Sequence, residues 1–144
     1  LGTRNDIKRV HNTGHNRAIN RHQWTQDELE VALDGEQSSH LQVLEALKTM
    51  IEIRSKQPAF HPNATQYTLH LQREVFGFWR QSMDRRQSIF CLHNVSETPQ
   101  QIDSNRLNLV GTDRWYDLLS GDVISDEGSV IELGPYESVW LSNR

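Results

Sequence analysis

The sequence contains little of what several classes of protein require. Its 144 residues include one cysteine, so no disulfide can form within the chain, and this cysteine usage favours a reducing compartment. The mean hydropathy is -0.69, and no apolar run approaches the roughly 18 residues of a spanning helix. No secretion signal is recognisable in the sequence. We therefore expect a cytoplasmic protein that does not associate with a membrane.

A large excess of positive charge is also missing. The net charge of -4 and the isoelectric point near 6.0 argue against a general nucleic-acid-binding protein. Extended disorder is not expected, because four Trp, four Phe and three Tyr supply aromatic side chains for a core. The length is that of one ordinary domain, or of a small domain with an attached piece of another.

The N-terminal stretch is polar and basic. Residues 1–40 contain 10 apolar side chains, whereas residues 41–144 contain 41. Residues 1–24 hold five basic residues and one acid, a net charge of +4, so the remainder of the chain carries -8. Because so few apolar groups cannot form a core, we expect residues 1–24 to be a loop that is mobile or held only by neighbouring copies.

Two helices are predicted after this stretch. Thr25 and Glu28 fit a capping box, and that helix should end near Asp34-Gly35. A second helix is expected over residues 39–56, with Pro58 ending it. Its broad apolar face indicates packing against another surface, and left uncovered it would cause self-association. The face comprises Leu41, Val43, Leu44, Leu47, Met50, Ile51 and Ile53.

From Gln66 the apolar pattern changes to a period of two, which is typical of strands. Turn residues separate the candidate strands at Met83–Arg86 and again at Ser120–Asp122. Short strands spaced in this way indicate an antiparallel sandwich. The expected fold class is α+β, with an N-terminal loop and two helices followed by an all-β antiparallel sandwich domain. The expected strand segments are 67–72, 75–79, 88–95, 100–109, 115–119, 130–133 and 138–141.

The pattern of reactive side chains predicts no metal site, no cofactor and no catalytic residue within the chain. None of the seven histidines forms an i, i+4 pair with an intervening acid on a predicted helix, and Cys91 has no CxxC partner. Cys91 lies in an apolar strand, which indicates packing. Many of the acids fall at turns, where Asp accepts local hydrogen bonds. No nucleophile with a nearby base is recognisable.

One segment carries a concentration of polar donors. Residues 13–21 contain Arg17 and Arg21 together with Asn16 and Asn20. Planar guanidinium and amide groups could bind sugar hydroxyls, a carboxylate or a phosphate. The alternative is that the two arginines anchor a loop through carboxylates and backbone carbonyl groups. The spacing alone leaves both readings open.

Several segments of the chain resemble one known family. Leu1–Asp6, the run Arg17–Arg21 and Trp24 resemble the end of the barrel in sucrose-phosphorylase-like members of the alpha-amylase superfamily (glycoside hydrolase family 13). The helix end at Ile53–Phe60 is similar to the eighth barrel helix of that superfamily. Three further segments resemble strands of its C-terminal β domain, namely Val75–Arg80, Trp115–Gly121 and Pro135–Leu141.

This resemblance implies an organisation and a function. Residues 1–60 would be the last loop and helices of a truncated (β/α)8 barrel, and residues 61–144 the C-terminal antiparallel β domain. The parent would be a retaining glucosyl-transferring enzyme whose catalytic carboxylates precede Leu1, so that this fragment is inactive alone. Arg17 would be the first candidate for contacting the bound sugar, and Arg21 would be the second candidate or a loop anchor. The partners would be a sugar and phosphate, with phosphorolysis or hydrolysis left open by Asn16 and Ala18, which replace Gly and an acid found in some relatives.

A different class of function is an independent carbohydrate-binding module. Trp79, Trp115, Trp140 and Tyr136 could form a platform on which sugars stack. Trp79 and Trp140 lie within apolar strand runs, which indicates burial and weakens this alternative.

Overall fold

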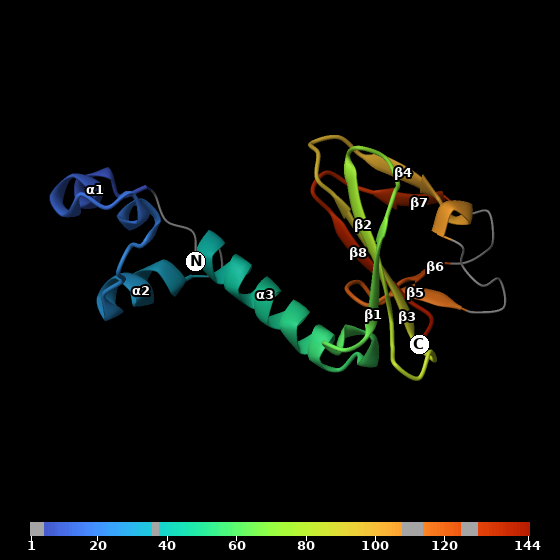
Figure 1. Ribbon diagram of the computed structural model, residues 1–144. Coiled ribbons are helices and arrows are strands. Elements are labelled where there is room, and N and C mark those ends of the chain that lie inside the picture. The colour runs from blue at the N-terminus through green and yellow to red at the C-terminus, as the bar shows by residue number, and fades with distance from the viewer. Residues whose placement is uncertain (1–4, 36–37, 108–113, 125–129) are drawn as a thin grey trace. The chain divides into compact units, whose positions relative to one another are not determined.

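The computed structural model describes residues 5–35, 38–107, 114–124 and 130–144 of the chain (Figure 1). It divides into two compact units, Leu1–Ile51 and Glu52–Arg144, which are described separately below. The first unit is helical, and the second contains all the described strands. The domain boundary expected between residues 60 and 61 stays a prediction. No described helix is long and apolar enough to cross a membrane.

The N-terminal stretch contains helical structure where the sequence analysis predicts a loop. Helix α1 spans Ile7–Thr13, with the Asp6 carboxylate accepting a hydrogen bond from the Arg9 backbone nitrogen at 2.9 Å. Gly14 ends this helix in the left-handed region, at φ 68°. A short 3-10 helix, η1, follows over Asn16–Asn20. The prediction of a loop is wrong for residues 7–13. The helix there is marked by its cap residues, Asp6 and Gly14, and not by an apolar pattern. None of its residues is buried, and its two apolar residues, Ile7 and Val10, are too few to form an apolar period.

Helix α2 spans Gln26–Leu33 and confirms the predicted capping box. The Glu28 backbone nitrogen donates to Thr25 Oγ1 at 3.2 Å, and the Thr25 backbone nitrogen donates to Glu28 Oε2 at 2.9 Å. The backbone hydrogen bond from Thr25, together with the bond from its hydroxyl, lowers the pKa of Glu28. Trp24, just before the cap, makes edge contacts with the rings of His22 and His40.

Helix α3 spans Ser39–Ser55, close to the predicted 39–56. None of its residues is buried, and Val43, Leu47 and Ile51 are at least half exposed. The broad apolar face is therefore present and uncovered. The last turn of the helix, from Glu52, belongs to the second unit, so that one continuous helix contributes to both units.

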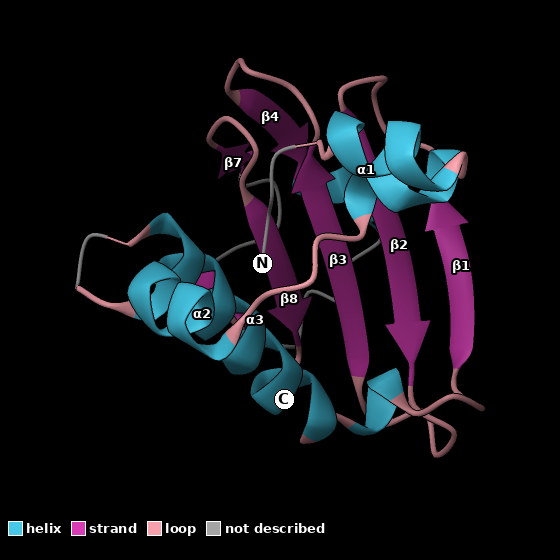
Figure 2. Ribbon diagram, turned by 90° about the vertical axis from the view of Figure 1, so that its left-hand side faces the viewer, coloured by secondary structure: helices cyan, strands magenta, loops and turns pink. Residues whose placement is uncertain are grey.

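The second unit is an antiparallel β sandwich, as predicted. Its larger sheet has six strands in the order β1-β2-β3-β8-β5-β6, and its smaller sheet pairs β4 with β7. Figure 2 shows β1, β2, β3 and β8 side by side, and Figure 1 shows β4 and β7 on one side of them. The strands are β1 Thr65–Leu69, β2 Val75–Gln81, β3 Ser88–Asn94, β4 Gln100–Asp103, β5 Trp115–Asp117, β6 Val123–Ile124, β7 Val130–Leu133 and β8 Ser138–Ser142.

Four predicted strands end earlier than expected: 88–95 ends at Asn94 and 115–119 at Asp117, and the other two end several residues early. The alternation over 67–72 yields a strand only to Leu69. The stretch predicted to pair over 100–109 is a strand to Asp103 and then a 3-10 helix, η3, over Ser104–Leu107; residues 108 and 109 lie outside the described residues. The Asp103 carboxylate accepts a hydrogen bond from the Asn105 backbone nitrogen at 2.9 Å, a local bond that favours a turn over a strand.

The hydrophobic core lies between the two sheets. Register places Phe90 opposite Leu141 and Leu92 opposite Val139, so these four side chains share the inner face of the larger sheet. Val75 of β2 also belongs to this core, and the smaller sheet, η3 and β5 add five more buried side chains: Ile102, Leu107, Trp115, Ile131 and Leu133.

The opposite, outer face of the larger sheet is covered at one end by a short 3-10 helix, η2, over Pro58–Phe60. Ala59 and Phe60 are buried, and the Phe60 ring packs on Trp140 with centroids 5.0 Å apart. The buried Gln87 side chain accepts a hydrogen bond from the Ala59 backbone nitrogen at 3.0 Å and donates to Gln57 at 2.6 Å. The segment that leads from α3 into the sheet is therefore part of the packed β domain.

Arg80 strengthens the same attachment. Its guanidinium donates to the carbonyl oxygens of Ala59 at 3.0 Å and of His61 at 2.6 Å. The Arg54 guanidinium also lies 5.0 Å from the centre of the Phe60 ring, within the range of a cation–π interaction.

Candidate functional site

The structure brings the two predicted site residues, Arg17 and Arg21, to one pocket within the first unit. The pocket has a volume of about 490 Å³. It is lined by Arg9 and Thr13 from α1, by residues 14–18, and by Arg21. Arg17 and Arg21 are exposed, whereas Ala18 beside Arg17 is buried. The sequence analysis did not single out Arg9, which α1 brings to the same place.

Hydrogen bonds between α1 and η1 build this pocket. The Arg9 side chain donates through Nη1 to the Arg21 carbonyl oxygen at 2.8 Å. The Asp6 backbone nitrogen donates to the Ile19 carbonyl oxygen, also at 2.8 Å. Within the connecting turn, the His15 backbone nitrogen donates to Thr13 Oγ1 at 3.3 Å. The main chain that carries Arg17 and Arg21 is therefore tied to the helix that carries Arg9.

The contacts of Arg17 and Arg21 bear on the two readings that the spacing left open. In the described part of the chain, neither Arg17 nor Arg21 forms an ion pair with a carboxylate. Arg21 is held through its backbone and not through its side chain: its carbonyl oxygen accepts a hydrogen bond from the Arg9 guanidinium. Among the described residues, neither guanidinium group of the predicted site has a carboxylate partner.

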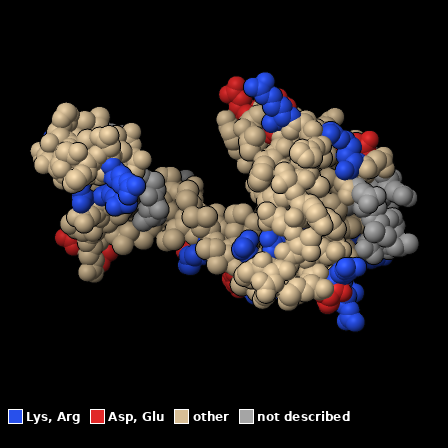
Figure 3. Space-filling view, in the orientation of Figure 1, with Lys and Arg blue, Asp and Glu red and all other residues tan. Residues whose placement is uncertain are grey.

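Figure 3 shows the charge distribution on one face of the molecule. On the left-hand part of this view a group of lysine and arginine atoms forms one patch, with acidic atoms at some distance below it. The residues that line the pocket include three arginines and no acid.

The sequence signal that could have found Arg9 is the spacing of Asp6 and Gly14, which are typical N-terminal and C-terminal cap residues enclosing one short helix.

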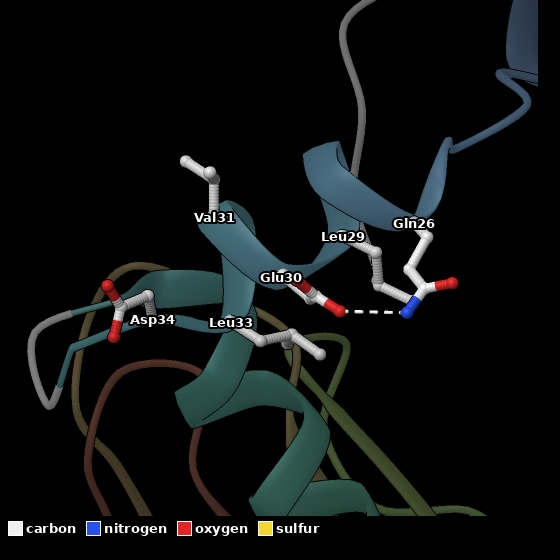
Figure 4. Close-up of a pocket in the computed structure, with 6 residues that line it drawn as sticks. All are labelled: Gln26, Leu29, Glu30, Val31, Leu33 and Asp34. Carbon is white, nitrogen blue, oxygen red and sulfur yellow. Dashed lines mark hydrogen bonds between the residues drawn. The ribbon is translucent and has the colours of Figure 1, made fainter.

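A second pocket, of about 780 Å³, lies along α2 (Figure 4). Its six lining residues all come from Gln26–Asp34. Its two facing polar groups satisfy each other, since Gln26 Nε2 donates to Glu30 Oε1 at 2.9 Å. Leu29 and Leu33 supply the apolar part of the wall. This pocket offers no free donor comparable to the arginines of the first pocket.

The other chemically suggestive residues have structural roles. No three His, Cys, Asp or Glu side chains within residues 5–35, 38–107, 114–124 and 130–144 lie close enough to hold a metal ion. Burial raises the pKa of the Cys91 thiol to about 12, which supports the interpretation of Cys91 as a packing residue. Burial also lowers the pKa of His93, whose ring stacks near Phe76 and Phe78 and hydrogen-bonds Ser138 at 2.8 Å.

Two of the four aromatic residues in the alternative platform are buried, and for Trp140 this confirms the burial that its apolar strand run indicates. Trp115 and Trp140 are 5% and 7% exposed, so neither can present a ring face to a sugar. Trp79 is partly buried and stacks on Tyr67, with centroids 5.4 Å apart. Tyr136 is 70% exposed, in a turn where its φ is 56°. The four side chains therefore do not form one exposed surface.

Comparison with known proteins identifies relatives along nearly the whole chain, although no family model matches it. Glucosylglycerate phosphorylase of Allomeiothermus silvanus is 31% identical over 141 residues, 98% of this chain. The enzyme of the same name from Spirochaeta thermophila is 31% identical over 150 residues, and that from Escherichia coli 30% over 141. The chain spans only 22%, 26% and 24% of these three relatives.

Solved structures support the fold independently. The structure of AmyP in complex with maltose superimposes with a TM-score of 0.61 at 18% identity, covering 76% of this chain and 21% of that protein. An Anoxybacillus alpha-amylase gives a TM-score of 0.60 at 17% identity, covering 75% of this chain and 23% of that protein. These comparisons agree with the resemblance found in the sequence: over nearly its whole length this chain is a homologue of part of the glucosylglycerate phosphorylases, and it shares its fold with part of two alpha-amylase-type structures.

Proposed function

We propose that this chain acts as the C-terminal part of a glucosyl-transferring enzyme of the retaining type. The observation that carries the proposal is the match to glucosylglycerate phosphorylases, which covers 98% of this chain and 22% of the relative from Allomeiothermus silvanus. The β domain, whose strands pack around one core, supports the enzyme. The carboxylates that carry out retaining transfer lie in parts of the enzyme outside this chain, so the chain alone is inactive.

The role proposed for the first unit is to contact the substrate. Arg17 contacts the bound sugar, and Arg21 makes a second contact from the same turn. Both line one pocket, and their guanidinium groups are free of carboxylate partners among the described residues. A guanidinium offers several donors in a fixed plane, which suits sugar hydroxyls and oxyanions alike.

The proposed reaction is phosphorolysis in preference to hydrolysis. The three matched relatives are all named glucosylglycerate phosphorylase, so phosphate is the expected co-substrate and glucosylglycerate the expected donor. In the retaining scheme glycerate leaves as the covalent glucosyl intermediate forms, and phosphate then displaces the enzyme carboxylate to give glucose 1-phosphate.

A chimeric enzyme tests this function. The region of the Escherichia coli phosphorylase that aligns with this chain is replaced by residues 1–144, and phosphorolysis of glucosylglycerate is measured. We expect the chimera to be active, and Arg17→Ala to lower its kcat/KM by about tenfold to a hundredfold, because a charged hydrogen-bond donor to the substrate is lost.

Arg73→Ala is the matched control. This substitution removes the same charge at an exposed residue of the β domain. It should leave kcat/KM within about twofold of the unmodified chimera. A chimera that unfolds at the same temperature as the parent phosphorylase but transfers no glucose contradicts the proposal. Equal losses for Arg17→Ala and Arg73→Ala contradict the role of Arg17.

The isolated chain should not bind neutral sugars. We expect no saturable heat in calorimetric titrations with sucrose, glucose or maltose, because the remaining walls of the sugar site lie outside the chain. Titrations at several protein concentrations separate ligand heat from self-association through the exposed face of α3. Binding of one sugar per chain, abolished by Tyr136→Ala, would instead favour an independent carbohydrate-binding module.

A further inference from the structure

The outer face of the larger sheet is covered over only part of its length. Strand register aligns Cys91 with Trp140, and in the next row of the same face Phe76 lies opposite His93. The Phe60 ring of η2 packs on Trp140, and Cys91 is fully buried. In the next row, by contrast, Phe76 is 52% exposed. The cover that η2 provides therefore ends between these two rows of side chains.

Five side chains form an apolar patch where this cover ends, and we call it the outer-face patch. Phe76, Phe78 and His93 pack together, with ring centroids 5.7 to 6.0 Å apart. Val95 continues the alternation of β3 by one step and is 57% exposed. Tyr136 lies close to Val95, because its backbone nitrogen donates to the carbonyl oxygen of the residue after Val95 at 3.1 Å. Exposed apolar side chains usually occur singly, so a contiguous patch indicates an interaction surface.

The outer-face patch can be covered without burying a charge. Burial lowers the pKa of His93, so its ring is neutral at pH 7. The Nδ1 atom of this ring already has a hydrogen-bond partner, Ser138 Oγ, at 2.8 Å. Removing a charge from water opposes association, and these five side chains carry none at pH 7. The patch therefore suits contact with an apolar surface.

Tyr136 is held in place for such a contact. Its φ of 56° lies in the left-handed region, which a residue with a side chain adopts only where its surroundings fix it. The Glu137 backbone nitrogen donates to the Gly134 carbonyl oxygen at 3.2 Å, and the Gly134 nitrogen donates to Glu137 Oε2 at 2.6 Å. A backbone that is already fixed loses less conformational entropy on binding, and tyrosine is common at interfaces.

We propose that the outer-face patch is the surface on which a helix from the rest of the enzyme packs. The identity of this partner rests on the proposed function. The chain aligns with only 22% to 26% of its phosphorylase relatives, and a (β/α)8 barrel carries its helices on the outside. A helix with an apolar stripe packs well on the face of an antiparallel sheet. Because Phe60 of η2 already packs on this face at Trp140, the helix extends a packing surface that exists within the chain.

Hydroxyl-radical footprinting read by mass spectrometry tests this interface. The isolated chain is compared with the chimera described above, in which residues 1–144 replace the aligned region of the Escherichia coli phosphorylase. Radical attack follows the exposed area of a ring, so oxidation of Phe76 and Tyr136 should fall about fivefold or more in the chimera. Tyr67 is the internal control, because it is 57% exposed and its register with Trp79 places it on the inner face. It should react equally in both proteins.

Matched substitutions assign the effect to the patch. Val95→Asp places a charge in the patch, so oxidation of Phe76 in the chimera should return to within about twofold of that in the isolated chain. Val123→Asp makes the same change at an exposed valine of β6, outside the patch, and should leave the protection unchanged. Both valines are exposed, so the isolated chain should unfold at nearly the same urea concentration with either substitution.

The proposal is overturned if Phe76 and Tyr136 react as strongly in the chimera as in the isolated chain, or if Val123→Asp removes the protection as fully as Val95→Asp. Protection in the isolated chain that grows with protein concentration identifies a second copy as the occupant and also overturns it. The two proposals fail separately, because footprinting does not depend on activity. A folded, inactive chimera with Phe76 protected removes only the glucosyl-transfer function, whereas an active chimera with Phe76 exposed removes only the interface.

Discussion

A chain that begins at residue 61 will not fold cooperatively, whereas one that begins at residue 52 will. The shorter chain lacks η2, whose Ala59 and Phe60 are buried against the outer face of the larger sheet. Its loss leaves Gln87 without the Ala59 nitrogen and the Gln57 side chain, and Arg80 without a carbonyl acceptor at Ala59. Removing a buried Phe and these bonds should cost more than about 5 kcal/mol, which is comparable to the whole stability of a small domain.

Urea denaturation followed by tryptophan fluorescence measures this effect in the two chains. The thiol of Cys91, the single cysteine, gives a second readout, because it is fully buried on the face that bears Trp140. It should react with a thiol reagent quickly in chain 61–144 and only on unfolding in chain 52–144. If both chains unfold at the same urea concentration and protect Cys91 equally, η2 is not part of the domain.

Replacing Asp117 by alanine will destabilise the β domain by about 3–5 kcal/mol, because three backbone donors lose a buried acceptor. The carboxylate accepts hydrogen bonds from the backbone nitrogens of Trp140 at 2.7 Å, Leu119 at 3.2 Å and Ser120 at 2.9 Å. Asp117 is 5% exposed, so water cannot replace these bonds without opening the fold. The residue both shapes the turn after β5 and joins β5 to β8.

Two variants sharpen that measurement. Asp122→Ala makes the same chemical change at an exposed position of the same turn, and it should alter the unfolding free energy by less than about 0.5 kcal/mol. Asp117→Asn keeps one carbonyl oxygen in place, so its unfolding free energy should lie between those of the two alanine variants. Equal unfolding midpoints for Asp117→Ala and Asp122→Ala would show that the buried hydrogen bonds do not stabilise the domain.

Much of the fold could be predicted because apolar periodicity and turn residues are local signals. The period of two from Gln66 identifies strands that the structure contains, and Thr25 with Glu28 predicts the cap of α2. Pairing could not be predicted in this way. Strand β7 pairs with β4 in a separate sheet although it directly precedes β8, and this depends on three-dimensional packing of Ile102 and Ile131, not on their neighbours in sequence.

The candidate site was predictable in part. Arg17 and Arg21 stand out because two guanidinium groups and two amides occur within residues 13–21. Arg9 does not, because its contribution depends on a helix without an apolar period and on a hydrogen bond to Arg21, twelve residues away. The burial of Trp115 was also missed, because alternation along a strand gives two faces and does not say which face meets a second sheet.

The order of the strands has a consequence for how the β domain is made. Strand β8, which follows every other described strand in the chain, lies in the middle of the larger sheet between β3 and β5. The six-stranded sheet therefore stays in two halves until Ser138–Ser142 have left the ribosome, and β3 must then find a partner more than forty residues distant. During synthesis the edge of β3 stays unpaired until β8 emerges, and an unpaired strand edge is a place where a nascent chain recruits a chaperone or aggregates.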